Sequence, residues 1–145
     1  MPQRKIKFAS LFSGVGGVEI ALSSLPQFDA VAFAEFDPNA SAVLRFHYPN
    51  VPNFGDVTKI DWSQFPKVDV LHSSSPCQSF SVAGKRLGME DDRGGSKLWD
   101  SYWKCLEIVK PEVITFENVK GLLSSNKGQD WKDILGKFAE HGYTV

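Results

Sequence analysis

One apolar run that ends abruptly in a polar, cysteine-bearing segment constrains the fold most strongly. Val68-Asp69-Val70-Leu71-His72 has the residues of a strand covered on both faces, and Ser73–Gly84 follows at once. Ligands gather at the carboxyl ends of strands in open α/β sheets, so Cys77 is a candidate nucleophile. The alternative is a buried core cysteine. The neighbouring residues argue against a core position for Cys77. Pro76 precludes a regular strand ladder, and the polar residues Gln78, Ser79 and Ser81 are rarely found in a core.

A glycine turn between a strand and a helix indicates a ligand pocket. Residues 6–12 have a strand pattern, residues 18–25 have a helical pattern, and Ser13-Gly14-Val15-Gly16-Gly17 joins them. This order lets the backbone approach a ligand closely and directs a helix amino-terminus at it. An ordinary tight turn is the alternative, but the position between strand and helix favours binding.

Acidic residues follow on the same predicted edge. The strand pattern of residues 30–36 ends near Glu35, where a carboxylate can accept hydrogen bonds from both hydroxyls of a ribose; a solvated strand end is the alternative. Asp37 precedes Pro38 and suits the N-cap of a helix over residues 39–46. Residues 48–53 could hold only a very short strand. Asp56 after them could accept from an exocyclic amine such as that of adenine, or close an Asx turn.

The stretch from Gln78 to about Lys97 is rich in glycine and polar residues, with little helical or strand pattern. A segment of this length in a compact domain is expected to be functional or disordered. Its basic side chains, Lys85, Arg86, Arg93 and Lys97, could meet phosphates, although three acidic residues dilute that signal. A merely solvated loop is the alternative.

A second candidate catalytic group follows the next strand pattern, over residues 111–116. Glu117 and Asn118 lie at its end, and a carboxylate after mostly apolar residues is expected to be partly desolvated and suited to carry a proton. Helices are predicted over residues 98–109, with Cys105 in the core, and over 131–141. Residues 142–145 look like the start of another strand. The glycine turn, acidic strand end, cysteine and glutamate thus fall on one edge of a single parallel sheet.

Length and composition place few further limits on function. A chain of 145 residues is expected to form one domain, and a net charge of −1 gives no global electrostatic case for a nucleic-acid partner. Two cysteines cannot build a disulfide framework, and no Cys/His cluster has metal-ligand spacing. The histidines are expected to be structural or surface residues. No apolar run approaches membrane length, so we expect a reduced, intracellular compartment, cytoplasmic in a bacterium or phage and nuclear in a eukaryote.

The motifs together resemble the N-terminal part of the DNA cytosine-5 methyltransferases, from Phe8 to the last residue. Phe12-Ser13-Gly14-Val15-Gly16-Gly17 is similar to the S-adenosylmethionine motif of that family, and Pro76-Cys77-Gln78-Ser79-Phe80-Ser81 to its nucleophile motif. Glu117-Asn118-Val119 is similar to its glutamate motif. The resemblance implies a Rossmann-like α/β fold, with helices on both faces of a parallel sheet.

The resemblance also implies roles for single residues. Cys77 would attack C6 of a flipped-out cytosine in DNA, and Glu117 would hold N3 and the exocyclic amine. The S-adenosylmethionine pocket would be formed by six residues: Phe12, Gly14, Gly16, Glu35, Asp56 and Pro76. The loop over the flipped base would contribute Gln78, Ser79, Ser81, Lys85, Arg86 and Arg93, with Asn118 beside it.

Two departures from the family pattern concern the chain as a whole and its cysteine loop. Ser73-Ser74-Ser75 stands where the family usually has glycines and a second proline. The resemblance covers a single partial domain over residues 1–145, without the C-terminal strands or the target-recognition domain. We therefore expect a fragment, or one subunit that needs a second chain, with little activity alone. A catalytically silent interaction module and a part of an RNA cytosine-5 methyltransferase are the alternatives.

Overall fold

The computed structural model describes residues 4–74 and 95–144, and the chain divides into two compact units. One unit comprises Met1–Ser75 and Ile108–Glu117, and the other comprises Pro76–Glu107 and Asn118–Val145. The first contains the sheet and the glycine turn. The second is mostly helical in the part that the structure describes.

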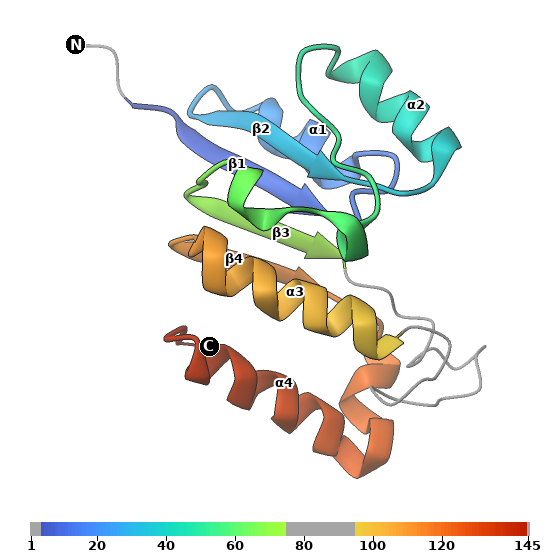
Figure 1. The fold of residues 1–145 in the computed structure, drawn as a ribbon, viewed down its shortest axis with the longest axis vertical. Coiled ribbons are helices and arrows are strands. Elements are labelled where there is room, and N and C mark those ends of the chain that lie inside the picture. Colours follow the sequence, from blue (N-terminus) through green and yellow to red (C-terminus); the bar gives the residue numbers. More distant parts are fainter. Residues whose placement is uncertain (1–3, 75–94, 145) are drawn as a thin grey trace. The chain divides into compact units, whose positions relative to one another are not determined.

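The first unit is built on a parallel four-stranded sheet. Its strands are β1 (Ile6–Leu11), β2 (Phe28–Ala34), β3 (Val70–Ser74) and β4 (Val113–Glu117), in the order β2-β1-β3-β4. Each neighbouring pair is parallel, so the four arrows in Figure 1 point the same way. The predicted parallel α/β sheet is confirmed. The strand order reverses between β1 and β3, which is the switch point where open sheets of this kind form ligand crevices.

The helices of this unit begin where local sequence signals predict. Helix α1 (Gly17–Ser23) follows the glycine turn, and α2 (Pro38–His47) follows β2. The Asp37 side chain accepts hydrogen bonds from the backbone N–H groups of Asn39 at 2.9 Å and Ala40 at 2.8 Å, which confirms the predicted N-cap. Two 3₁₀ helices, η1 (Val57–Lys59) and η2 (Trp62–Gln64), lead to β3.

The core of the first unit follows the central strands. Phe8, Ala9 and Leu11 of β1 are fully buried, as is Leu71 of β3. Consecutive burial on both faces explains why these strands read as continuous apolar runs rather than as alternating patterns. Beside β2, the segment 52–54 forms only an isolated parallel bridge, between Phe33 and Asn53, as the turn-rich passage predicts.

The described part of the second unit contains three helical elements: α3 (Gly95–Val109, whose last residues belong to the first unit), η4 (Lys120–Gly128) and α4 (Gln129–Glu140). Trp103 of α3 packs against Phe138 of α4 with ring centroids 5.3 Å apart, and against His141 at 5.7 Å. Cys105 is fully buried, so its predicted place in the core is confirmed. Neither α3 nor any other helix within the described ranges has the length and apolar character to cross a membrane.

The prediction of a strand that begins at Gly142 is wrong for residues 142–144, which the structure describes. Tyr143 and Thr144 have no strand pairing. Instead Gly142, with φ of 86°, ends α4: its N–H donates to the carbonyl of Ala139 at 2.9 Å, and the N–H of Tyr143 donates to that of Phe138 at 3.0 Å. This pair of bonds is a Schellman motif, in which the glycine serves the helix end.

Candidate functional site

The candidate residues of the first unit lie along the carboxyl edge of the sheet. Strand register aligns one row across all four strands: Ala34, Leu11, Ser73 and Phe116. The next residue of each strand or turn forms the edge itself: Glu35, Phe12, Ser74 and Glu117. Because β2 ends at Ala34, Glu35 lies just beyond its strand, whereas Glu117 is the last residue of β4.

The glycine turn is held in a conformation that favours glycine. Gly14 has φ of 56° and Gly16 has φ of 85°, and Phe12 before them also has a positive φ, of 55°. The N–H of Phe12 donates to the carbonyl of Ala34 at 2.8 Å, which ties the turn to the end of β2. A Cβ on Gly16 would lie 2.8 Å from Cδ2 of Leu44, so only glycine allows α2 to approach this closely. The predicted close approach of this turn to a ligand stays a prediction.

The carboxylate of Glu35 faces this turn. One oxygen accepts from the N–H of Gly14 at 2.7 Å, and the other accepts from the N–H of Asp37 at 2.7 Å. Each carboxylate oxygen can accept two hydrogen bonds, so each keeps one acceptor position. The two oxygens therefore suit a ligand with two adjacent hydroxyls, such as a ribose.

Asp56 forms a local Asx-type turn, which the sequence predicts as the alternative to contact with an exocyclic amine. Its Oδ1 accepts from the N–H of Thr58 at 3.0 Å and from the hydroxyl of Thr58 at 2.8 Å, and Lys59 lies 3.4 Å from Oδ2. These bonds, the Thr58 hydroxyl foremost, lower the pKa of Asp56. The carboxylate thus caps η1, and its contact with an adenine stays a prediction.

Glu117 is exposed, so the partial desolvation expected for it is not found. The physical reason is its place, because it ends β4, the outermost strand on its side of the described sheet. It is paired with Ser74 of β3, the residue from which the chain continues toward Cys77. Three gaps of about 4.8 Å separate the strand ends that carry Glu35 and Glu117, so these ends lie about 14 Å apart across the edge.

A buried histidine near this edge, with hydroxyl partners on β3 and β4, was not predicted as a site residue. His72 is 5% exposed, and its ring is hydrogen-bonded to the hydroxyls of Thr115 at 2.8 Å and Ser74 at 3.0 Å. Burial lowers the pKa of His72, while the carboxylates of Glu19 and Glu117 act in the opposite direction. Glu19 is 1% exposed, and its Oε1 has no hydrogen-bond partner in the described structure.

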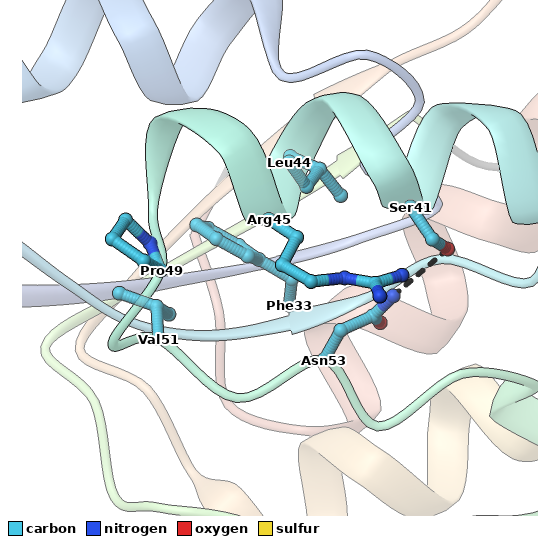
Figure 2. A pocket seen from close by; sticks show the side chains of 7 residues that line it. All are labelled: Phe33, Ser41, Leu44, Arg45, Pro49, Val51 and Asn53. Atoms are coloured by element: carbon cyan, nitrogen blue, oxygen red, sulfur yellow. Dashed lines mark hydrogen bonds between the residues drawn. The ribbon is translucent and has the colours of Figure 1, made fainter.

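A pocket of about 360 Å³ lies behind the Glu35 strand end, between α2 and the segment 49–53. Figure 2 shows its lining, with Phe33 and Leu44 on the apolar side and a hydrogen bond joining Ser41 to Asn53. Arg45 also lines it. Asn53 and Ser41 were not predicted as site residues, because the sequence shows only a turn and an exposed helix position there.

Nine predicted site residues are not among those described above. Eight of them lie outside the described residues: Pro76, Cys77, Gln78, Ser79, Ser81, Lys85, Arg86 and Arg93. Asn118 belongs to the second unit, and its side-chain oxygen accepts from the N–H of Val119 at 2.8 Å.

Comparison with known sequences supports the motif assignment. The family model described as C-5 cytosine-specific DNA methylase matches residues 6–145. The chain is 42% identical over 144 residues to the orphan methyltransferase M.SPRI of Bacillus phage SPR, covering 97% of this chain and 32% of that protein. It is 36% identical over 143 residues to the type II methyltransferase M.Bsp6I of Bacillus sp. (strain RFL6), covering 97% and 44%. The chain thus spans less than half the length of these relatives.

Solved structures share the fold. The Dnmt2 methyltransferase of S. pombe aligns with a TM-score of 0.67 and 24% identity, over 91% of this chain and 42% of that one. A putative DNA modification methyltransferase encoded within an E. coli prophage aligns with a TM-score of 0.71 and 19% identity, over 94% and 38%. The Rossmann-like fold expected from the motifs is confirmed.

Proposed function

The chain belongs to the C-5 cytosine-specific DNA methylase family, and on that premise we propose that it supplies the cofactor pocket and the reacting residues for methylation of cytosine C5 in DNA. The observation that carries this proposal is the Glu35 carboxylate, held by the N–H of Gly14 within the turn that resembles the S-adenosylmethionine motif of the family. The RNA alternative is not favoured, because the matched family is described as a DNA methylase.

The residues present fit S-adenosylmethionine. The positive-φ turn of Phe12, Gly14 and Gly16 offers backbone at close range, and Glu35 keeps one acceptor on each oxygen for the ribose hydroxyls. Asp56 and the segment around it would contact the adenine. When bound, S-adenosylmethionine supplies an electrophilic methyl group to C5.

The chain's own residues would make cytosine reactive. C5 is a poor nucleophile, and attack of the Cys77 thiolate at C6 breaks the C5=C6 double bond and gives an enamine that is nucleophilic at C5. Glu117 would hydrogen-bond or protonate N3 and so stabilise the charge that develops during the attack. After methylation, loss of the C5 proton and elimination of the thiolate restore the double bond. Cys77 and Glu117 are the proposed catalytic residues.

A second polypeptide segment would complete the enzyme. Helix α1 buries Glu19 and leaves Val18 and Ile20 exposed, and Val15 in the glycine turn is 60% exposed. Phe36, next to the ribose-binding Glu35, is 73% exposed. Apolar side chains gathered around a cofactor pocket indicate a surface that another segment covers. We propose that this segment, on a second chain or in a longer protein, also carries target recognition.

Calorimetric titration of the chain with S-adenosylhomocysteine tests the cofactor pocket without a DNA target. We expect binding that weakens by about tenfold or more in Glu35→Gln, which retains the volume of the side chain but only one oxygen acceptor. Gln27→Ala, a change outside the turn and the strand edge, serves as the matched control. Absence of binding by the folded wild-type chain would contradict a pocket formed by these residues alone.

Trapping with 5-fluorocytosine tests the covalent step. Fluorine at C5 cannot leave as a proton does, so the thiolate adduct persists after methyl transfer. Duplex DNA in which every cytosine carries fluorine avoids the need to know the target sequence. With S-adenosylmethionine and the complementing segment present, we expect a DNA adduct on wild-type protein and none on Cys77→Ser. Cofactor binding without any adduct would instead support the silent interaction module.

A further inference from the structure

The side chain of Asn53 pairs with the backbone of Glu35 as a neighbouring strand would. Its Oδ1 accepts from the N–H of Glu35 at 2.9 Å, and its Nδ2 donates to the carbonyl of Glu35 at 3.1 Å. Asn53 is placed for this by the bridge to Phe33, where the N–H of Phe54 donates to the Phe33 carbonyl at 2.8 Å. The side-chain amide of Asn53 thus takes the place of a neighbouring strand at Glu35. It extends the hydrogen bonding of β2 by one residue beyond Ala34.

Every remaining hydrogen-bonding position of Asn53 serves the same arrangement. Nδ2 also donates to the hydroxyl oxygen of Ser41 at 3.0 Å, and that hydroxyl donates to the carbonyl of Glu35 at 3.1 Å. Oδ1 also accepts from the N–H of Gly55 at 3.1 Å. We call Asn53 and Ser41 the Glu35 clamp. Figure 2 shows the two side chains meeting on the wall of the pocket beneath α2.

The clamp holds only the backbone of Glu35, so the carboxylate of Glu35 can form other hydrogen bonds. Because its backbone N–H and carbonyl are held from one side, its carboxylate reaches the N–H groups of Gly14 and Asp37 on the other. We propose that Asn53, assisted by Ser41, is a positioning residue that sets the Glu35 carboxylate for the ribose of the cofactor. This inference rests on the proposed function for the identity of the ligand, and on the observed hydrogen bonds for the positioning itself.

The chemistry of the clamp demands an amide. Only asparagine and glutamine carry an acceptor and a two-hydrogen donor on one planar group, and the extra methylene of glutamine would displace both. Aspartate retains the acceptor but loses both donated bonds, and it places a carboxylate against the carbonyl of Glu35. Asn53→Asp is therefore a near-isosteric change that removes the clamp.

Amide hydrogen exchange measured by NMR on the full chain without ligand tests the positioning directly. In Asn53→Asp we expect the amides of Gly14 and Asp37 to exchange roughly tenfold faster, because the carboxylate that protects them shifts. Ser41→Ala should show a smaller change of the same kind. Arg45→Ala is the matched control, since Arg45 lines the same pocket and contributes no bond to the clamp. Unchanged exchange at Gly14 and Asp37 in Asn53→Asp would overturn the proposal.

A double-mutant cycle on S-adenosylhomocysteine affinity separates positioning from general weakening of the fold. Asn53→Asp should weaken binding about three- to tenfold in the wild-type background and much less in Glu35→Gln, because the two residues act as one unit. Additive losses would refute action through Glu35. Failure of the wild-type chain to bind counts against the proposed function alone, since the exchange measurement needs no ligand. Retained protection of Ser10 and Leu71 in the central strands shows that each variant is folded.

Discussion

Substitution of three neighbouring glycines by alanine should separate backbone strain from steric conflict. At Gly16, φ is 85° and an added Cβ would lie 2.8 Å from Cδ2 of Leu44. The left-handed backbone costs about 1–2 kcal/mol for alanine, and overpacking costs about 1–3 kcal/mol more. The reduced freedom of the unfolded chain returns about 0.4–1 kcal/mol, so Gly16→Ala should lower the free energy of unfolding by about 1–4.5 kcal/mol.

Gly14 and Gly17 are controls for Gly16: Gly14 has the left-handed backbone without the steric conflict, and Gly17 has neither. Gly14 has φ of 56° with nothing within 4 Å of an added Cβ, so Gly14→Ala should cost only about 1 kcal/mol. Gly17 begins α1 and also has open space, so Gly17→Ala should be neutral or stabilise by about 0.5 kcal/mol.

Urea unfolding followed by circular dichroism measures all three variants, alone and in a Leu44→Ala background. The truncation removes Cδ2, so the penalty for Gly16→Ala should fall to that of Gly14→Ala. If Gly16→Ala costs no more than Gly14→Ala, or if its penalty is the same with Leu44 truncated, then close packing of α2 against the turn does not require this glycine.

Three further changes test other parts of the first unit. Burial lowers the pKa of His72 against the opposing carboxylates of Glu19 and Glu117, so the unfolded chain binds more protons below about pH 6.5. The urea midpoint should therefore fall as the pH decreases from about 7.5 to 5.5; an equal slope in His72→Asn would assign the effect to another group. Asp37→Ala should lower stability by about 1 kcal/mol in thermal unfolding and Asp37→Asn by much less, because asparagine also caps helices; equal losses would contradict the cap. Val113 is 51% exposed on β4, the outermost strand on its side of the described sheet, and we expect such an edge strand to promote self-association of the chain. Val113→Lys should reduce that self-association in sedimentation velocity, and unchanged association would place the contact elsewhere.

Short-range patterns predicted most of the fold. The Asp37-Pro38 pair predicts the start of α2 because a cap bonds only to the next few N–H groups. The continuous apolar runs predict β1 and β3 because parallel strands are covered on both faces. Gly142 shows the limit of such patterns, since Gly-Tyr-Thr-Val has strand-forming residues but its glycine ends α4.

Roles that depend on burial could not be predicted in the same way. The helical pattern over residues 18–25 does not say which side of α1 is covered, and the helix buries Glu19 while it exposes Val18 and Ile20. Which side of a seven-residue helix is covered depends on the glycine turn that precedes it and on α2 beside it, not on its own periodicity. His72 likewise acquires Thr115 as a polar partner only when β4 pairs with β3.

The amino-acid sequence by itself determined the parallel strands, the positive-φ glycine turn and the family, because these depend on local backbone preferences and on motif residues in a set order. Only the tertiary structure decided how Glu35 is held. Asn53 lies 18 residues farther along the chain, and its amide reaches the backbone of Glu35 because the segment after α2 runs beside the end of β2. A hydrogen bond between residues so far apart depends on strand placement, and no spacing rule in the sequence encodes it.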